Sequence, residues 1–179
     1  MARQWVIAGL LLWPLSAAAD ETALQKAMQK DPDRFASRVV DLIAGFGGAD
    51  GLRLEGIEEH IALERAGARA SDLRRFQSMD LDFDGSIDRD ELAISQRAAN
   101  ADGRGRLERQ FAGADANADG RADAAELAEQ GRTAAFRALG EEEAGFLRSL
   151  MSLDADGNGA LTTAEVERAV AGMGLDKAG

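Results

Sequence analysis

Three twelve-residue stretches of the sequence carry oxygen-bearing side chains at alternate positions, then a glycine, then a final glutamate. They begin at Asp80, Asp115 and Asp154, and their sequences are DLDFDGSIDRDE, DANADGRADAAE and DADGNGALTTAE. Alternate side chains in a tight loop converge on one point, and glycine at the sixth position permits the sharp turn. Hard divalent cations prefer carboxylate, amide and carbonyl oxygens. The spacing therefore predicts a cation site in each stretch.

Each position in these stretches has an expected role in holding the ion. The side chains at positions one, three and five face it, the glutamate at position twelve offers both oxygens, and position seven contributes its backbone carbonyl. Position nine is expected to act through a water molecule. The expected ligands are Asp80, Asp82, Asp84, Ser86 and Glu91 in the first stretch, Asp115, Asn117, Asp119, Arg121 and Glu126 in the second, and Asp154, Asp156, Asn158, Ala160 and Glu165 in the third.

The three stretches resemble the calcium loop of EF-hand proteins of the calmodulin-like superfamily. The resemblance implies an all-α fold of paired helix-loop-helix units. Asp88, Asp123 and Thr162 each stand three residues before the final glutamate of their loop, a spacing typical of a capping box that starts the outgoing helix. Each loop is therefore expected to lead directly into a helix.

Three loops leave one hand without a partner, and the segment before Asp80 offers a candidate. A helix is expected from Pro32, and the stretch after it keeps Asp50, Gly51, Leu54 and Glu58 but lacks the early carboxylates. We interpret residues 32–66 as a degenerate first hand that has lost its metal.

These units predict two EF-hand lobes. Lobe 1 is expected at residues 32–99, with the degenerate hand at 32–66 packed on an intact hand at 72–99. Lobe 2 is expected at residues 105–171, with two intact hands. A glycine-rich linker at 100–104 separates the lobes, an N-terminal lead covers 20–31, and a tail covers 172–179.

The first nineteen residues differ from the rest of the chain. Arg3 is followed by an apolar run from Trp5 to Leu15 and by small residues up to Ala19, which is typical of a secretory signal peptide. The alternative, a retained membrane anchor, would need about 20 apolar residues. We expect residues 1–19 to be cleaved after Ala19 and the mature protein to be exported, with the periplasm as its compartment.

Composition narrows the partners. The formal net charge is −11 at pH 7, which disfavours nucleic acid and anionic membranes and favours cations. The chain has no cysteine, so no disulfide stabilises it. His60 is the only histidine, and its polar neighbours predict that it lies on a solvated helix face. The sequence has no nucleophile-and-base motif and no phosphate-loop motif. We therefore expect a protein that is not an enzyme, with no nucleic-acid partner and no membrane partner after signal cleavage.

The resemblance leaves the role of the ion open. About three calcium ions are expected, with Mg²⁺ or lanthanides as alternatives. The expected roles of the protein are a buffer, a structural binding module or a sensor. The alternative is a calcium-dependent adaptor for one specific protein partner. An exported, lanmodulin-like lanthanide binder is a further alternative, because Asp88 and Asp123 place an acid at position nine. However, position two carries Leu81, Ala116 and Ala155 where that family has proline.

Overall fold

The computed structural model describes residues 22–175, which are mostly helical. Two strands of two residues each are the only named strands in this range. In chain order the elements are α1 (Ala23–Lys30), α2 (Pro32–Phe46), α3 (Leu54–Gln77), β1 (Ile87–Asp88), α4 (Arg89–Arg97), α5 (Ala101–Ala114), β2 (Arg121–Ala122), α6 (Ala124–Ala138), α7 (Glu141–Ser149), the 3-10 helix η1 (Leu150–Leu153) and α8 (Thr163–Leu175).

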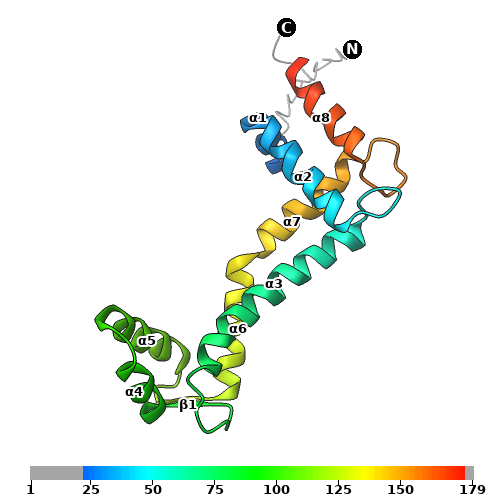
Figure 1. The fold of residues 1–179 in the computed structure, drawn as a ribbon. Coiled ribbons are helices and arrows are strands. Elements are labelled where there is room, and N and C mark those ends of the chain that lie inside the picture. Colours follow the sequence, from blue (N-terminus) through cyan, green and yellow to red (C-terminus); the bar gives the residue numbers. More distant parts are fainter. Residues whose placement is uncertain (1–21, 176–179) are drawn as a thin grey trace, which may run out of the picture.

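The elements gather at two ends that are joined by a pair of helices. Helices α1, α2 and α8 lie at one end, α4 and α5 lie at the other, and α3 and α6 run side by side between them (Figure 1). The chain passes from the first end to the second along α3 and returns along α6 and α7. The loops at the two ends are therefore far apart in space.

Several helices begin where the sequence predicts caps. The Asp31 carboxylate accepts a hydrogen bond from the Arg34 N–H, and Pro32 occupies the first turn of α2. Asp88 and Asp123 form capping boxes with the final glutamates of their loops, at the starts of α4 and α6. These caps satisfy amide groups that have no partner within the helix. The predicted loop-to-helix transitions are thus present.

Helix α3 is longer than expected. A break between the two hands was expected at residues 67–71, but the helix runs without interruption for 24 residues. Gly67 lies inside this helix and does not mark a turn, and open space surrounds the position where a Cβ would be. A 24-residue helix spans about 36 Å. The segment before α3 and the Asp80 loop after it therefore lie at opposite ends of one rod.

This separation changes which loops pair. Strand β1 pairs with β2, so that Ile87 lies opposite Ala122. At the other end Leu52 forms an isolated antiparallel bridge with Leu161. The sequence predicts that the segment near Asp50 lies beside the Asp80 loop, and that the two later loops lie beside each other. The observed pairs are instead the Asp80 and Asp115 loops, and the Leu52 segment with the Asp154 loop.

The expected linker at 100–104 is also helical. It forms the first turn of α5, where the Asn100 side chain accepts a hydrogen bond from the Gly103 N–H at 2.8 Å. Gly103 is buried, and a Cβ there would lie 3.0 Å from the Ala99 Cβ. Asparagine is among the preferred N-cap residues. The glycines that suggested a flexible linker therefore lie within a capped helix.

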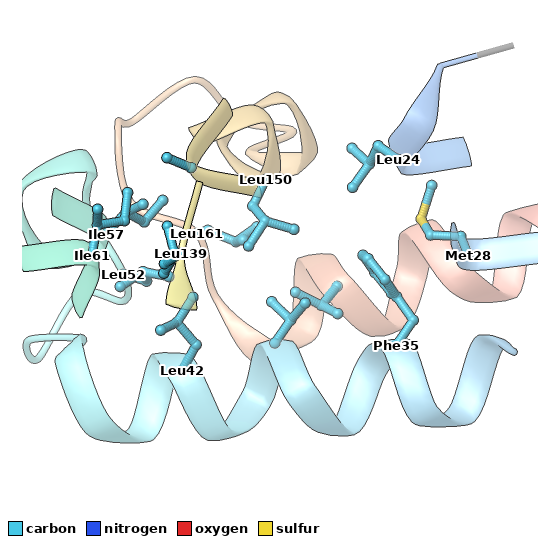
Figure 2. Close-up of a cluster of buried hydrophobic side chains, with 13 residues drawn as sticks. Leu24, Met28, Phe35, Leu42, Leu52, Ile57, Ile61, Leu139, Leu150 and Leu161 are labelled. Carbon is cyan, nitrogen blue, oxygen red and sulfur yellow. The ribbon is translucent and has the colours of Figure 1, made fainter. Parts of the chain in front are cut away.

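A hydrophobic cluster at one end draws on both halves of the chain, and we call it the terminal cluster. Phe35 and Leu42 point from α2 toward Leu150 and Leu161 (Figure 2). Helix α1 adds two side chains to the same interior. The buried members are Leu24, Met28, Phe35, Val39, Leu42, Leu52, Ile57, Ile61, Leu139, Ala144, Leu150, Leu161 and Val166.

A second, smaller cluster lies at the other end of the molecule. We call it the central cluster because its residues come from the middle of the sequence. Phe111 from α5 is fully buried within it, and the guanidinium of Arg89 lies 4.4 Å from the centre of the Phe111 ring. Its buried members come from the end of α3 and the residues just after it, both strands, α4 and α5. They are Phe76, Met79, Ile87, Leu92, Phe111, Ala114 and Ala122.

Close contacts hold α3 against α6 and α7. Gly131 of α6 is buried, and a Cβ at this position would lie 2.9 Å from Cγ of Arg69 on α3. Arg65 donates to the Leu139 carbonyl at 2.9 Å and lies over the ring of Phe136. The backbones approach because a hydrogen atom replaces a side chain at the crossing.

None of the helices within residues 22–175 is long and apolar enough to cross a membrane. The expected signal peptide at residues 1–19 lies outside the described residues.

Candidate metal centre

The aspartate side chains of the Asp80 loop accept hydrogen bonds from backbone N–H groups of the same loop. The N–H of Gly85 donates to Asp80 Oδ2 at 3.1 Å, that of Asp84 donates to Asp82 Oδ1 at 3.1 Å, and that of Ser86 donates to Asp84 Oδ1 at 2.9 Å. Gly85 has φ of +82°, in the left-handed region. The glycine therefore does what the sequence predicts, because an L side chain is disfavoured in that conformation.

The final glutamate closes the loop. Glu91 is buried, and its Oε1 accepts from the Leu81 N–H at 2.6 Å while its Oε2 accepts from the Asp88 N–H at 3.0 Å. One carboxylate thus ties the start of the loop to the start of α4. Buried charges are normally paired or coordinate metals, and here the charge is supported by backbone donors.

The other two loops repeat this pattern of backbone hydrogen bonds to the loop carboxylates, which we call the hydrogen-bond frame. Gly120 and Gly159 donate to the first aspartate of their loops at 3.0 and 2.7 Å, and both have positive φ. The final glutamates receive the amides of Ala116 and Asp123 in one loop, and of Ala155 and Thr162 in the other. The corresponding bonds from position five to position three, and from position seven to position five, are also present. The three stretches that match in sequence also match in local geometry.

Two of the loops bring carboxylates together. Oxygen atoms of Asp80, Asp82 and Asp84 lie within 4.8 Å of one another, and so do oxygen atoms of Asp154, Asp156 and Glu165. Among the described residues, the Asp115 loop forms no such group of three carboxylates. Position three is Asn117 in that loop, and its amide donates to Asp119 Oδ2 at 3.0 Å.

Asp80 carries one atom that its surroundings leave unsatisfied. Its Oδ2 accepts from Gly85, but its Oδ1 is buried and has no hydrogen-bond partner in the described part of the chain. An unsatisfied buried acceptor is uncommon in native structures and costs roughly 1–3 kcal/mol. Asp80 belongs to a group of three carboxylates with converging oxygens. A cation at this point would satisfy it, so the oxygen-only donor set fits calcium.

The electrostatics of two ligand positions follow from the same frame. Hydrogen bonds from the Thr162 side chain and backbone lower the pKa of Glu165 to about 2, with further help from the amides of Ala155 and Asp156. The Ser86 N–H, followed by the charge of Arg121, lowers the pKa of Asp84. Hydrogen bonds that favour the ionised form keep both groups negative at neutral pH.

The residues at position seven place different side chains around the frame. Ser86 and Ala160 are buried, whereas Arg121 is half exposed and extends from its own loop to the neighbouring one. Its guanidinium Nη2 lies 2.5 Å from Asp84 Oδ2 and 3.0 Å from Ser86 Oγ. Sequence reasoning considered only the carbonyl of Arg121 and missed this contact, because it joins residues 37 positions apart.

The segment between α2 and α3 has a different arrangement. Leu52 is buried and forms a bridge with Leu161 of the Asp154 loop, whereas Leu54, the apolar residue kept in the sequence pattern, is 47% exposed. Counted from Leu52 as position eight, position twelve falls on Gly56. A Cβ at Gly56 would lie 2.5 Å from the Phe46 carbonyl oxygen. The end of α2 thus fills the space where the other loops hold a glutamate.

Two further residues singled out in the sequence lie away from the acidic loops. Glu58 forms a two-point ion pair with Arg148 of α7, with its Oε1 at 2.5 Å from Nε and its Oε2 at 3.0 Å from Nη2. His60 packs edge-on against Phe46, with ring centres 4.9 Å apart, so it is partly buried and not on the fully solvated face that its neighbours suggested.

Comparison with known protein families supports the assignment of the Asp80 loop as an EF-hand loop. A family model described as EF hand matches residues 73–94, which cover the end of α3, the Asp80 loop and part of α4. Residues 73–94 are an EF-hand motif. No curated protein and no solved structure matches the chain. The hydrogen-bond frame of this EF-hand is the one that recurs in the Asp115 and Asp154 loops.

Proposed function

We propose that this protein binds about three calcium ions, one in each of the Asp80, Asp115 and Asp154 loops. The observation that carries the proposal is the buried, unpartnered Oδ1 of Asp80 within a group of three converging carboxylates of an EF-hand motif. The repeated hydrogen-bond frame extends the proposal to the other two loops. The EF-hand motif is typically non-catalytic, and no catalytic role is proposed.

The expected ligand set is retained in this proposal. Side chains at positions one, three, five and twelve would hold the ion, and the carbonyls of Ser86, Arg121 and Ala160 would complete each site. When bound, calcium would neutralise the clustered carboxylates and tie each loop to its outgoing helix. The terminal glutamates would then act in two ways, because each already bonds backbone amides at both ends of its loop.

A single substitution tests the role of the Asp80 loop. Glu91→Gln replaces the carboxylate at position twelve with a neutral amide. Calorimetric titration should then show one calcium ion fewer per protein. Asp90→Asn is the matched control, since Asp90 is exposed, adjacent and outside the ligand set. It removes the same charge and should leave the number of ions unchanged. An unchanged number of ions in the Glu91→Gln protein would contradict the proposal.

We also propose that the Leu52 segment is a degenerate hand that retains pairing and has lost its metal. Its support is the Leu52–Leu161 bridge together with Gly56 at the position of the terminal glutamate. In this proposal one EF-hand lobe pairs the Leu52 segment with the Asp154 loop and would bind one ion. The other lobe pairs the Asp80 loop with the Asp115 loop and would bind two ions.

An adaptor role is a second candidate, and an apolar cleft favours it. A cavity of about 660 Å³ lies beside α2 and α7, and its apolar lining includes Val39, Phe46 and Phe146. A specific partner with an apolar segment would suit this lining. Binding of a hydrophobic dye that rises with calcium would support an adaptor or sensor. Unchanged dye binding in the calcium-loaded protein would support a buffer or a structural role.

Export and metal identity complete the proposal. Arg3, the apolar run from Trp5 to Leu15 and the small residues up to Ala19 support cleavage after Ala19 and a periplasmic location. N-terminal sequencing of the mature protein tests this directly. Competition between calcium and lanthanum separates a calcium protein from a lanmodulin-like lanthanide binder, while magnesium competition tests the remaining alternative.

A further inference from the structure

The paired loops of the central cluster are linked by a charged contact as well as by their strands. Arg121 is the seventh residue of the Asp115 loop, and its side chain crosses to the Asp80 loop. The crossing is set by the antiparallel register, which places Arg121 opposite Asp88. The guanidinium therefore lies beside ligand positions of a loop to which it does not belong.

The contact engages a particular oxygen of Asp84. Oδ1 of this carboxylate already accepts the Ser86 N–H at 2.9 Å. Oδ2 is the oxygen left to face a cation, and Arg121 Nη2 lies 2.5 Å from it. The same nitrogen lies 3.0 Å from Ser86 Oγ, so two groups hold the guanidinium in place. Both oxygens of Asp84 are thus engaged by donors of this chain.

The contact also changes the charge of the site. Affinity in such loops depends on the number of charged ligands, and Arg121 offsets one of the carboxylates that make the Asp80 loop the most acidic of the three. A positive group beside a ligand oxygen also repels an incoming divalent cation. The position-seven residues of the other two loops, Ser86 and Ala160, have uncharged side chains.

We propose that Arg121 is a built-in competitor for the divalent cation at the Asp80 loop: its guanidinium holds Asp84 Oδ2, and ion binding must weaken that contact. The inference rests on the proposed calcium function. Its consequence is that the affinity of the Asp80 loop is set below the value that its ligands alone would give, by a residue of the neighbouring loop.

The test isolates the Asp80 loop. Glu126→Gln and Glu165→Gln are combined in a parent protein so that calorimetric calcium titration reports mainly the Asp80 loop. Arg121→Gln is then added to the parent. Partly exposed ion pairs are modest and screened by salt, so calcium affinity should rise by about fivefold at low salt and by less at high salt. Arg132→Gln is the control, because Arg132 is exposed on α6 and pairs with Glu129 of the same helix.

The outcomes separate the inference from the function on which it rests. No calcium binding by the parent would overturn the calcium proposal and the inference with it. Binding by the parent with equal or weaker affinity in the Arg121→Gln protein would overturn the inference alone, and weaker affinity would mean that Arg121 positions Asp84. A rise of the same size in the Arg132→Gln protein would also overturn it, since net charge alone would then explain the change.

A second measurement needs no substitution at Arg121. In the parent, the NMR resonance of the Arg121 side-chain Nε–H should shift on addition of calcium, because the guanidinium loses its contact with Asp84. The Nε–H resonance of Arg148, which pairs with Glu58 in the terminal cluster region, serves as the internal reference. An Arg121 resonance that does not move on saturation with calcium would contradict the inference.

Discussion

The N–H of Leu52 donates to the carbonyl of Leu161 at 2.8 Å, and the N–H of Leu161 donates to the carbonyl of Leu52 at 2.7 Å. Both side chains are fully buried in the terminal cluster. This reciprocal pair joins the segment before α3 to the loop before α8, so it ties together two parts of the chain that are distant in sequence. The stability of the terminal cluster should depend on it.

Gly51 permits the Leu52–Leu161 pair and gives the first prediction. Its φ is +119°, and a Cβ there would lie 2.6 Å from the Leu161 carbonyl oxygen. Gly51→Ala should lower the free energy of unfolding by about 1–3 kcal/mol through backbone strain and steric overlap. Chemical denaturation measures this. Gly45→Ala is the control, since open space surrounds that position in α2, and it should cause no loss. Equal stability of the two variants would show that the backbone conformation of Gly51 does not contribute to stability.

The crossing of α3 and α6 gives the second prediction. Gly131→Val should destabilise the protein by about 1–3 kcal/mol, because the added carbons would overlap Arg69 and Leu73. Gly67→Val on α3 introduces the same side chain where nothing lies within 4 Å. Thermal unfolding of both variants would separate packing from helix propensity. A melting temperature lowered equally by both would show that the α3–α6 contact is not the cause.

The ion pair between α3 and α7 gives a prediction about pH. The hydrogen bond from Arg148, followed by its charge, lowers the pKa of Glu58 below its ordinary value of 4.5. A group with a lowered pKa in the folded state stabilises the protein above its unfolded pKa, and this contribution is lost as pH falls through the folded value. The stability difference between the native protein and Glu58→Gln should therefore be greatest near neutral pH and shrink below about pH 4.5.

The matched control for this experiment is Glu59→Gln, which removes the same charge from an exposed neighbour on α3. Urea denaturation across the pH range should give a smaller difference for Glu59→Gln than for Glu58→Gln. Because both partners of the Glu58–Arg148 pair are partly exposed, added salt should reduce the effect. A pH-independent difference for Glu58→Gln would show that the ion pair is not responsible.

The local parts of the structure could be predicted from the sequence. The loop frame depends on hydrogen bonds within twelve residues, as between Asp80 and Gly85 or between Leu81 and Glu91, so residue type and spacing determine it. The caps at Asp31 and Asp88 are equally local. For the same reason, the EF-hand motif at residues 73–94 was predicted from its own positions.

The long-range parts could not be predicted in this way. Gly67 does not interrupt α3, which packs along α6 as one continuous helix. That continuity then decides which loops can meet. Leu52 and Leu54 are both apolar, and only the tertiary structure shows which one is buried. The Arg121–Asp84 contact likewise exists only because two separate loops pair.

A calorimetric titration of the metal-free protein with calcium tests the proposed calcium binding most directly. We expect binding of about three ions per chain, with one fewer after Glu91→Gln and an unchanged number after Asp90→Asn. Titration that produces no binding heat, together with no calcium retained after equilibrium dialysis, would show that these loops do not hold calcium.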